Sequence, residues 1–202
     1  MTTRGFFGRR PRVEDEKRLP PGQYKTDDFP VLSLGATPRV ELASWRFTLR
    51  HAAKPIKSWT WAEFEALPHS PWQGDIHCVT KWSKFDTSWE GVTIDNLFAA
   101  AGIAPPTGFL LAHSYDGYDT NVPLPDLVGG KAMIATRFDG KPLLAEHGGP
   151  ARLLVPHLYF WKSAKWVNEL RFTDKDEAGF WELRGYHMYG DPWQQQRYTD
   201  DP

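Results

Sequence analysis

The chain has very little cysteine: Cys78 is the only one in 202 residues, so no disulfide can form within the chain. It also has no run of about 18 apolar residues, and we therefore expect no membrane-spanning helix. A charge excess is missing as well, with 24 Lys and Arg against 25 Asp and Glu. Nucleic-acid-binding domains are usually basic, so this balance argues against nucleic acid as the partner.

The N-terminus lacks the apolar stretch that an export signal needs. A twin arginine stands at Arg9 and Arg10, but prolines and acidic residues follow it. We therefore expect no export signal and a cytoplasmic protein. Residues 1–28 are charged and interrupted by Pro and Gly, which predicts an extended or mobile N-terminal arm.

Residues 29–202 are long enough for one domain with a sizeable core. With 17 Pro and 17 Gly in the chain, helices should be few and short. A helix is predicted within 58–68, with Thr60 and Glu63 at capping-box spacing, and another between Thr93 and Gly102. Strands are predicted at 41–49, 74–81, 109–114, 133–137, 151–155 and 166–173. Their irregular alternation with short helices predicts an α+β fold with a mixed sheet and many loops.

Cys78 is the first residue that suggests chemistry. A lone thiol is a small buried hydrophobe, a nucleophile or a soft metal ligand. The neighbouring His77 and Lys81 are expected to lower the pKa of the thiol. A zinc site would need further ligands, and the sequence offers neither a second cysteine nor a His-x-x-x-His spacing.

Two further segments suggest binding of an anion. Glycines 148 and 149 let the backbone approach a ligand closely, and Arg152 offers a planar fork that suits a phosphate. Lys162 and Lys165 flank a small Ser-Ala pair in a basic loop. The alternatives are a hairpin loop with a surface arginine and a solvated charged turn. The ten tryptophans indicate a Trp-rich core or a rigid aromatic-walled pocket for a planar cofactor.

Taken together, these motifs resemble the catalytic domain of the sulfite oxidase family of molybdenum enzymes. The resemblance covers residues 29–197 and rests on Cys-Val-x-x-Trp-Ser at 78–83, Trp-x-Gly-Val at 89–92, His-Gly-Gly-Pro-x-Arg-Leu-Leu-Val-Pro at 147–156 and Lys-Ser-x-Lys-Trp at 162–166. It implies a molybdenum-molybdopterin cofactor whose metal is bound by the Cys78 thiolate. It also implies cofactor contacts from Ser114, His147, Arg152, Ser163, Ala164 and Lys165, the last three at the phosphate end.

The tail from Gly185 to Arg197 is similar to the closing segment of a bacterial methionine-sulfoxide reductase catalytic subunit of the same family, which implies that Trp193 lies near the metal. The pattern departs from that reductase at Leu32-Ser33, where it has Tyr-Glu, and at Thr80, where it has glutamate. The arginines that bind sulfite in sulfite oxidase find no match.

We therefore expect an oxidoreductase that transfers an oxygen atom to or from a sulfite-like or sulfoxide-like substrate and exchanges electrons with a separate partner. Two alternatives are a non-catalytic molybdopterin-binding protein of the same fold and a thiol-dependent hydrolase that uses Cys78.

Overall fold

The computed structural model describes residues 13–104, 106 and 108–202, and the Arg9-Arg10 pair lies outside them. The helices are α1 (Val13–Glu16), α2 (Trp61–Glu65) and α3 (Ile94–Ala101), with short 3-10 helices η1 (Leu124–Asp126), η2 (Ala145–His147), η3 (Phe160–Lys162) and η4 (Glu182–Arg184). The strands are β1 (Tyr24–Lys25), β2 (Arg46–His51), β3 (Lys54–Thr60), β4 (Ser70–His77), β5 (Trp82–Thr93), β6 (Phe109–Ser114), β7 (Asp119–Pro123), β8 (Met133–Phe138), β9 (Lys141–Pro142), β10 (Arg152–Leu154) and β11 (Val167–Thr173).

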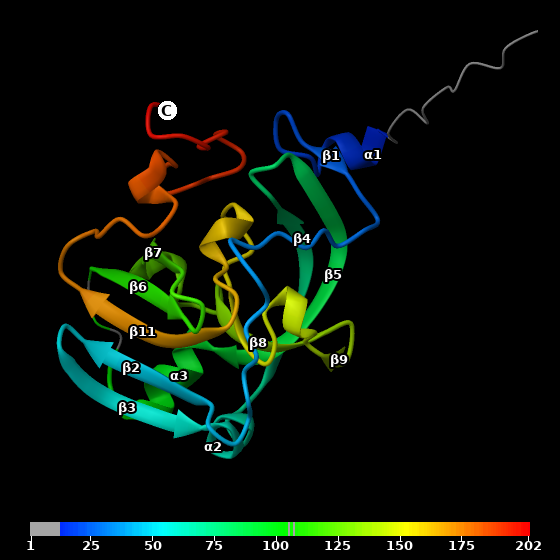
Figure 1. The fold of residues 1–202 in the computed structure, drawn as a ribbon. Coiled ribbons are helices and arrows are strands. Elements are labelled where there is room, and N and C mark those ends of the chain that lie inside the picture. Colours follow the sequence, from blue (N-terminus) through cyan, green and yellow to red (C-terminus); the bar gives the residue numbers. More distant parts are fainter. Residues whose placement is uncertain (1–12, 105, 107) are drawn as a thin grey trace, which may run out of the picture.

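The strands form two mixed sheets. One is six-stranded, in the order β1-β5-β8-β10 with β4 paired to β5 and β9 paired to β8. The other is five-stranded, in the order β3-β2-β11-β6-β7. Each sheet has one parallel pair, β1 with β5 and β2 with β11. Figure 1 shows η3 in the space between β5 of the first sheet and β6 and β7 of the second. The predicted α+β class is confirmed, with two mixed sheets where the sequence suggested one.

The larger core joins the two sheets. Its buried apolar side chains come from β2, α2, α3, β6 and β11 and from one face of β8 and β10. A smaller aromatic cluster lies on the other face of β5 and β8 and contains Cys78, Trp82, Trp89 and Phe160. Several of the ten tryptophans therefore lie in the core, which agrees with the Trp-rich core considered above. Others lie beside the only thiol.

The capping signals in the sequence are confirmed. Glu63 N donates to Thr60 Oγ1, and the Glu63 carboxylate accepts from Thr60 N, which closes the capping box of α2. Thr93 caps α3, which ends at Gly102 with φ +67°. The part of the chain that the structure describes contains no helix long and apolar enough to cross a membrane.

The described part of the N-terminal arm packs on the domain. β1 pairs in parallel with the start of β5, at Trp82 and Ser83. Arg18 Nε donates to Asp75 Oδ2 at 2.8 Å, and its Nη2 reaches Asp86 Oδ1 at 2.6 Å. The arm thus lies against the β4–β5 hairpin, whose connecting turn carries Cys78.

Candidate molybdopterin site

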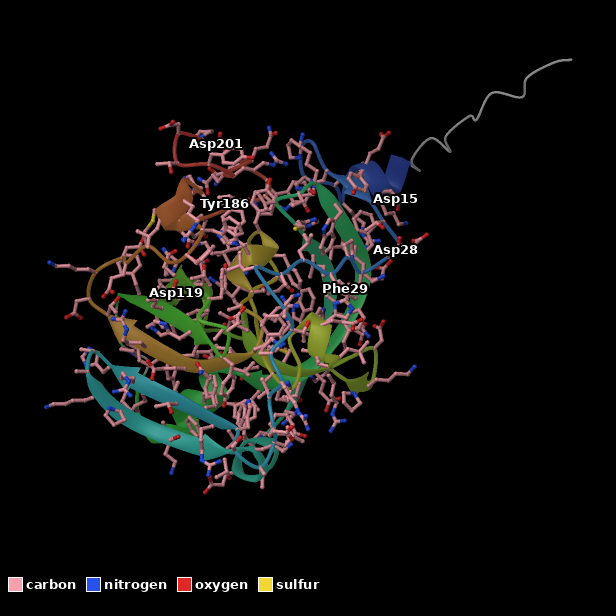
Figure 2. All side chains as sticks on the ribbon, in the orientation of Figure 1. Asp15, Asp28, Phe29, Asp119, Tyr186 and Asp201 are labelled. Atoms are coloured by element: carbon pink, nitrogen blue, oxygen red, sulfur yellow. The ribbon has the colours of Figure 1, made fainter. Side chains whose placement is uncertain are left out.

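A cavity of about 320 Å³ opens beside the Cys78 turn. Besides this turn, residues from 29–34 after the arm, from 116–118 after β6, from 160–166 around η3 and from 181–186 near the C-terminus line it, together with Arg152. Figure 2 shows Phe29 on the side of β5 and Tyr186 beside η4. The cavity therefore depends on segments that are far apart in the sequence. Its lining residues include Cys78, Trp82, Arg152, Phe160, Trp161, Ser163, Ala164, Lys165, Trp181 and Tyr186.

A tight turn between β4 and β5 presents the thiol. Lys81 N donates to the Cys78 carbonyl at 3.0 Å, and Cys78 N donates to the Trp82 carbonyl at 2.8 Å. Lys81 has φ +77°, a left-handed conformation that costs a non-glycine residue roughly 1–2 kcal/mol. The Thr80 hydroxyl donates to Cys78 Sγ at 3.2 Å. Cys78 is only 6% exposed, and it still lines the cavity.

The neighbours of Cys78 do not activate it, contrary to the sequence-based expectation. Burial raises the pKa of the Cys78 thiol, and the Thr80 hydrogen bond offsets this only in part. His77 is no cationic neighbour, because burial lowers its pKa to about 4 and its Nδ1 pairs with Ser83 Oγ at 2.8 Å. A thiol that stays protonated is a poor nucleophile, and this counts against the hydrolase alternative.

Arg152 is a buried cation that faces the same cavity. It is 1% exposed, which excludes the surface arginine considered above. Nη1 donates to the His147 carbonyl at 2.8 Å and Nη2 to the Ser163 carbonyl at 2.7 Å, while Nε has no partner among the described residues. Burial lowers the pKa of Arg152 to about 9. This buried guanidinium has no carboxylate partner among the described residues. It is therefore a strong binding site for an anion.

Lys165 adds a second cation to this end of the cavity. Its Nζ donates to the Glu146 carbonyl at 2.7 Å and to Ser33 Oγ at 3.0 Å. Burial, and then the charge of Arg152, lowers the pKa of Lys165 to about 8. Gly148, with φ +105°, packs so closely here that an added Cβ would lie 3.0 Å from Lys165 Cα. The glycine therefore lets the 147–152 loop approach the lysine.

The remaining predicted residues divide into two groups. Ser163 and Ala164 line the cavity with Lys165. Ser114, His147 and Trp193 do not line it. Ser114 pairs with Val167 at the end of β6, and its buried hydroxyl has no described partner. His147 stacks on Phe29, with ring centroids 4.0 Å apart.

Trp193 lies on the surface, 51% exposed, with its ring edge-on to His77 at 6.2 Å. Its backbone N donates to Asp191 Oδ1 at 2.8 Å within a turn. The indole therefore stands next to the residue that precedes Cys78 and outside the cavity lining.

Lys162 does not belong to a solvated basic loop. Its side chain is 0% exposed and pairs with the equally buried Glu182 at 2.6 Å. Nζ also donates to Asn121 Oδ1 and to the Met188 carbonyl, both at 2.6 Å. Its task is structural, since this network attaches the C-terminal segment to β7 and η3.

The sequence suggested an aromatic-walled pocket but did not identify the rings that form its wall. Trp161, Trp181 and Tyr186 line the cavity, and Tyr186 lies 5.1 Å from Trp161 and 4.9 Å from Trp181, measured between ring centroids. The available signal was the density of aromatic residues at 180–189. It did not show which rings face a cavity, because that depends on how the tail folds back onto η3.

Comparison with known proteins places these residues in a family. Residues 34–181 match the model of the oxidoreductase molybdopterin binding domain. The chain is 40% identical over 197 residues to the oxidoreductase YuiH of Bacillus subtilis, covering 97% of this chain and all of that protein. It is 26% identical over 151 residues to a putative protein-methionine-sulfoxide reductase subunit, YedZ1, of Azospira oryzae, covering 75% of this chain and 57% of that protein. The structure resembles the sulfane dehydrogenase SoxCD of Paracoccus pantotrophus, with a TM-score of 0.61 and 18% identity over 87% of this chain and 56% of that one.

The cavity fits a molybdopterin in its donor set. A soft thiol stands in its wall, and two cations stand together at the loop that the glycines bring close. Arg152 Nε and Trp82 Nε1 are buried donors without partners in the described ranges, and both residues line the cavity. Such donors are expected where a polar ligand binds. From the family match and this geometry, the chain belongs to the oxidoreductase molybdopterin-binding domain family and is a sulfite-oxidase-like, molybdopterin-dependent oxidoreductase.

Proposed function

We propose that the chain transfers an oxygen atom to or from the sulfur of a small sulfur oxide, with molybdenum bound by Cys78. The observation that carries the proposal is the arrangement of one cavity, which has a thiol, a buried guanidinium without a counter-ion and a wall of aromatic rings. The Azospira oryzae relative, named as a putative protein-methionine-sulfoxide reductase subunit, supports a sulfur oxide as the substrate.

Each group has a distinct role in this proposal. The Cys78 thiolate would hold the metal, while Arg152 and Lys165 would neutralise the phosphate end of the pterin. The cofactor, when bound, supplies the redox change that oxygen-atom transfer requires. The protein contributes binding, orientation and a largely water-free site for the reacting sulfur.

The aromatic wall favours an uncharged substrate. Arg152 and Lys165 are the only Lys or Arg side chains among the described lining residues, and in this proposal the cofactor occupies both. Sulfite is an anion, so it would enter a cavity with no cation left to neutralise it. An organic sulfoxide carries no charge, and its sulfur and alkyl groups pack well on Trp161, Trp181 and Tyr186.

Electrons would come from a separate protein. The Azospira oryzae relative is named as a reductase subunit, which supports a partner of this kind. The cytoplasmic location expected from the N-terminal sequence stays a prediction, and fractionation of the native host would test it.

The test combines metal analysis with two assays. Protein made in a host that supplies the cofactor should hold about one molybdenum per chain and should reduce a dialkyl sulfoxide with an artificial electron donor. Cys78→Ser should lose the activity, because a hydroxyl is a harder and less acidic ligand. Met133→Leu removes another sulfur from the same cluster of buried residues and should keep both the molybdenum and the activity. Full activity in Cys78→Ser would refute the metal assignment, and faster sulfite oxidation than sulfoxide reduction would refute the substrate class.

A further inference from the structure

The N-terminal arm reaches the residue that carries the thiol. Gln23 Nε2 donates to the Cys78 carbonyl at 3.1 Å. Tyr24 N donates to the Lys81 carbonyl at 2.8 Å, on the far side of the same turn. The arm therefore holds both the first residue of the turn and its strained residue, Lys81.

The head group of Gln23 is buried although the arm around it is exposed. Its Oε1 is buried and has no hydrogen-bond partner among the described residues. The Gln23 amide also lies close enough to Tyr159 to offset part of the rise in the tyrosine pKa that burial causes. Tyr159 stacks on Trp161 with centroids 5.3 Å apart. Gln23 thus bonds to the Cys78 turn and lies beside Tyr159, whose hydroxyl has no hydrogen-bond partner among the described residues.

The arm is fastened on both sides of Gln23. Before it, Arg18 pairs with Asp75 and Asp86 at the β4–β5 hairpin, and Arg197 Nη2 donates to the Pro21 carbonyl at 3.2 Å. After it, β1 pairs with β5 at Tyr24. Gln23 lies between Pro21 and β1, so the arm cannot shift without moving its amide. A buried amide held at a fixed point is suited to position another group.

We propose that Gln23 is a positioning residue for the Cys78 thiol: its amide holds the Cys78 carbonyl and so fixes the turn that directs Sγ into the cavity. The Cys78 carbonyl accepts from both Lys81 N and Gln23 Nε2, one bond within the turn and one from the arm. Without the second bond the turn would open more often, because Lys81 is held in a conformation that a lysine rarely adopts. The inference rests on the proposed function only where it concerns the metal.

The first experiment uses metal-free full-length protein, so that it does not depend on the cofactor. The alkylation rate of Cys78 by iodoacetamide measures how often the turn opens, because the closed thiol is buried. Gln23→Met keeps the length of the side chain and removes the donor. It should raise the alkylation rate about tenfold, the effect expected for one lost buried hydrogen bond. Gln73→Met, the same change at an exposed position of β4, should leave the rate unchanged.

Local opening must be separated from global unfolding. The faster alkylation of Gln23→Met should depend only weakly on urea at low concentration, since a local opening exposes little surface. If this variant does not fold, Gln23→Asn, which shortens the reach by one carbon, takes its place. An unchanged rate, or a rate with the full urea dependence of unfolding, would overturn the proposal.

A second readout concerns the metal. In protein made with the cofactor, Gln23→Met should copurify with severalfold less molybdenum than Gln73→Met. If the wild type binds no molybdenum but alkylation still accelerates in Gln23→Met, the positioning role stands and the proposed function fails. If molybdenum is retained and alkylation is unchanged, Gln23 is not a positioning residue.

Discussion

Arg152 donates through Nη2 to the Ser163 carbonyl at 2.7 Å, which connects the start of β10 with the loop that carries Lys165. Its guanidinium carbon also lies 4.1 Å from the centre of the Phe160 ring. The guanidinium group of Arg152 is thus held in place by two carbonyls and one aromatic face before any ligand binds. A cation fixed in this way loses little side-chain entropy when an anion binds.

Replacement of Arg152 should separate cofactor binding from stability. Arg152→Met removes a desolvated charge but leaves the carbonyls of His147 and Ser163 without a donor. These effects oppose each other, so the free energy of unfolding of metal-free protein should change by less than about 2 kcal/mol. The cofactor should bind about 10 to 100 times more weakly, as expected for one lost charge-assisted contact. Urea unfolding and the pterin content of purified protein measure the two quantities.

Arg152→Lys is the control for charge alone. It keeps a cation but cannot form the two-pronged contact, so its pterin content should lie between those of wild type and Arg152→Met. Wild-type pterin content in Arg152→Met would show that the guanidinium does not face the cofactor.

Lys165 should make cofactor binding depend on pH. Its pKa is about 8 in the folded chain against an ordinary value of 10.5. The metal-free unfolded chain therefore binds more protons between these values, and Lys165 alone makes metal-free protein more stable as pH rises through this window. Binding of an anion needs the protonated amine, so cofactor affinity should fall as pH rises through about 8.

The release of pterin from purified holoenzyme, followed by fluorescence at pH 7 and pH 9, measures this effect. Release should be faster at pH 9 in wild type, and the difference should shrink in Lys165→Gln. Lys131 is an exposed lysine whose Nζ donates to the Pro125 carbonyl, away from the cavity lining, and Lys131→Gln should behave as wild type. Equal pH dependence in wild type and Lys165→Gln would remove this lysine from the site.

Local signals in the sequence predicted much of the fold. Capping of α2 by Thr60, the end of α3 at Gly102 and the strand at 109–114 depend on neighbouring residues, and all three are confirmed. The division of the strands between two sheets depends on pairings such as β2 with β11, which join residues more than a hundred positions apart. No local pattern encodes such a pairing.

The site shows the same limit. Cys78, Arg152 and Lys165 were identified from motifs, and the structure brings them to one cavity. The environment of each was harder to predict. Lys162 and Lys165 look alike in sequence, yet one is paired with Glu182 in the core and the other lines the cavity. Likewise the pKa of Cys78 is raised, because burial outweighs the neighbours that sequence alone can see.

The buried Lys162–Glu182 pair should matter for stability and not for cofactor contact. Lys162→Met leaves the Glu182 carboxylate buried without its cation and should lower the free energy of unfolding by about 3–5 kcal/mol. The double variant Lys162→Met/Glu182→Gln removes both charges and should recover part of that loss. Urea unfolding measures both. A single variant as stable as wild type would mean that water reaches this pair.

Trp193 offers a test of how the C-terminal turn serves the cavity. The resemblance implies an indole near the metal, and the structure shows it exposed and edge-on to His77, next to Cys78. Because half of the side chain is already in water, Trp193→Ala should change the free energy of unfolding by no more than about 0.5 kcal/mol and should retain molybdenum. If the turn at 190–193 closes over the cavity during turnover, the same variant should alter kcat or KM for a sulfoxide.

Leu183→Ala is a suitable control, because Leu183 is 72% exposed in the same C-terminal segment and does not line the cavity. It should leave both the kinetics and the melting temperature unchanged. A Trp193→Ala enzyme with a lower melting temperature and normal kinetics would show that the indole only anchors the tail. Altered kinetics with a normal melting temperature and full molybdenum would place Trp193 at the entrance of the site, because a change at an exposed ring can then act only through the path of the substrate.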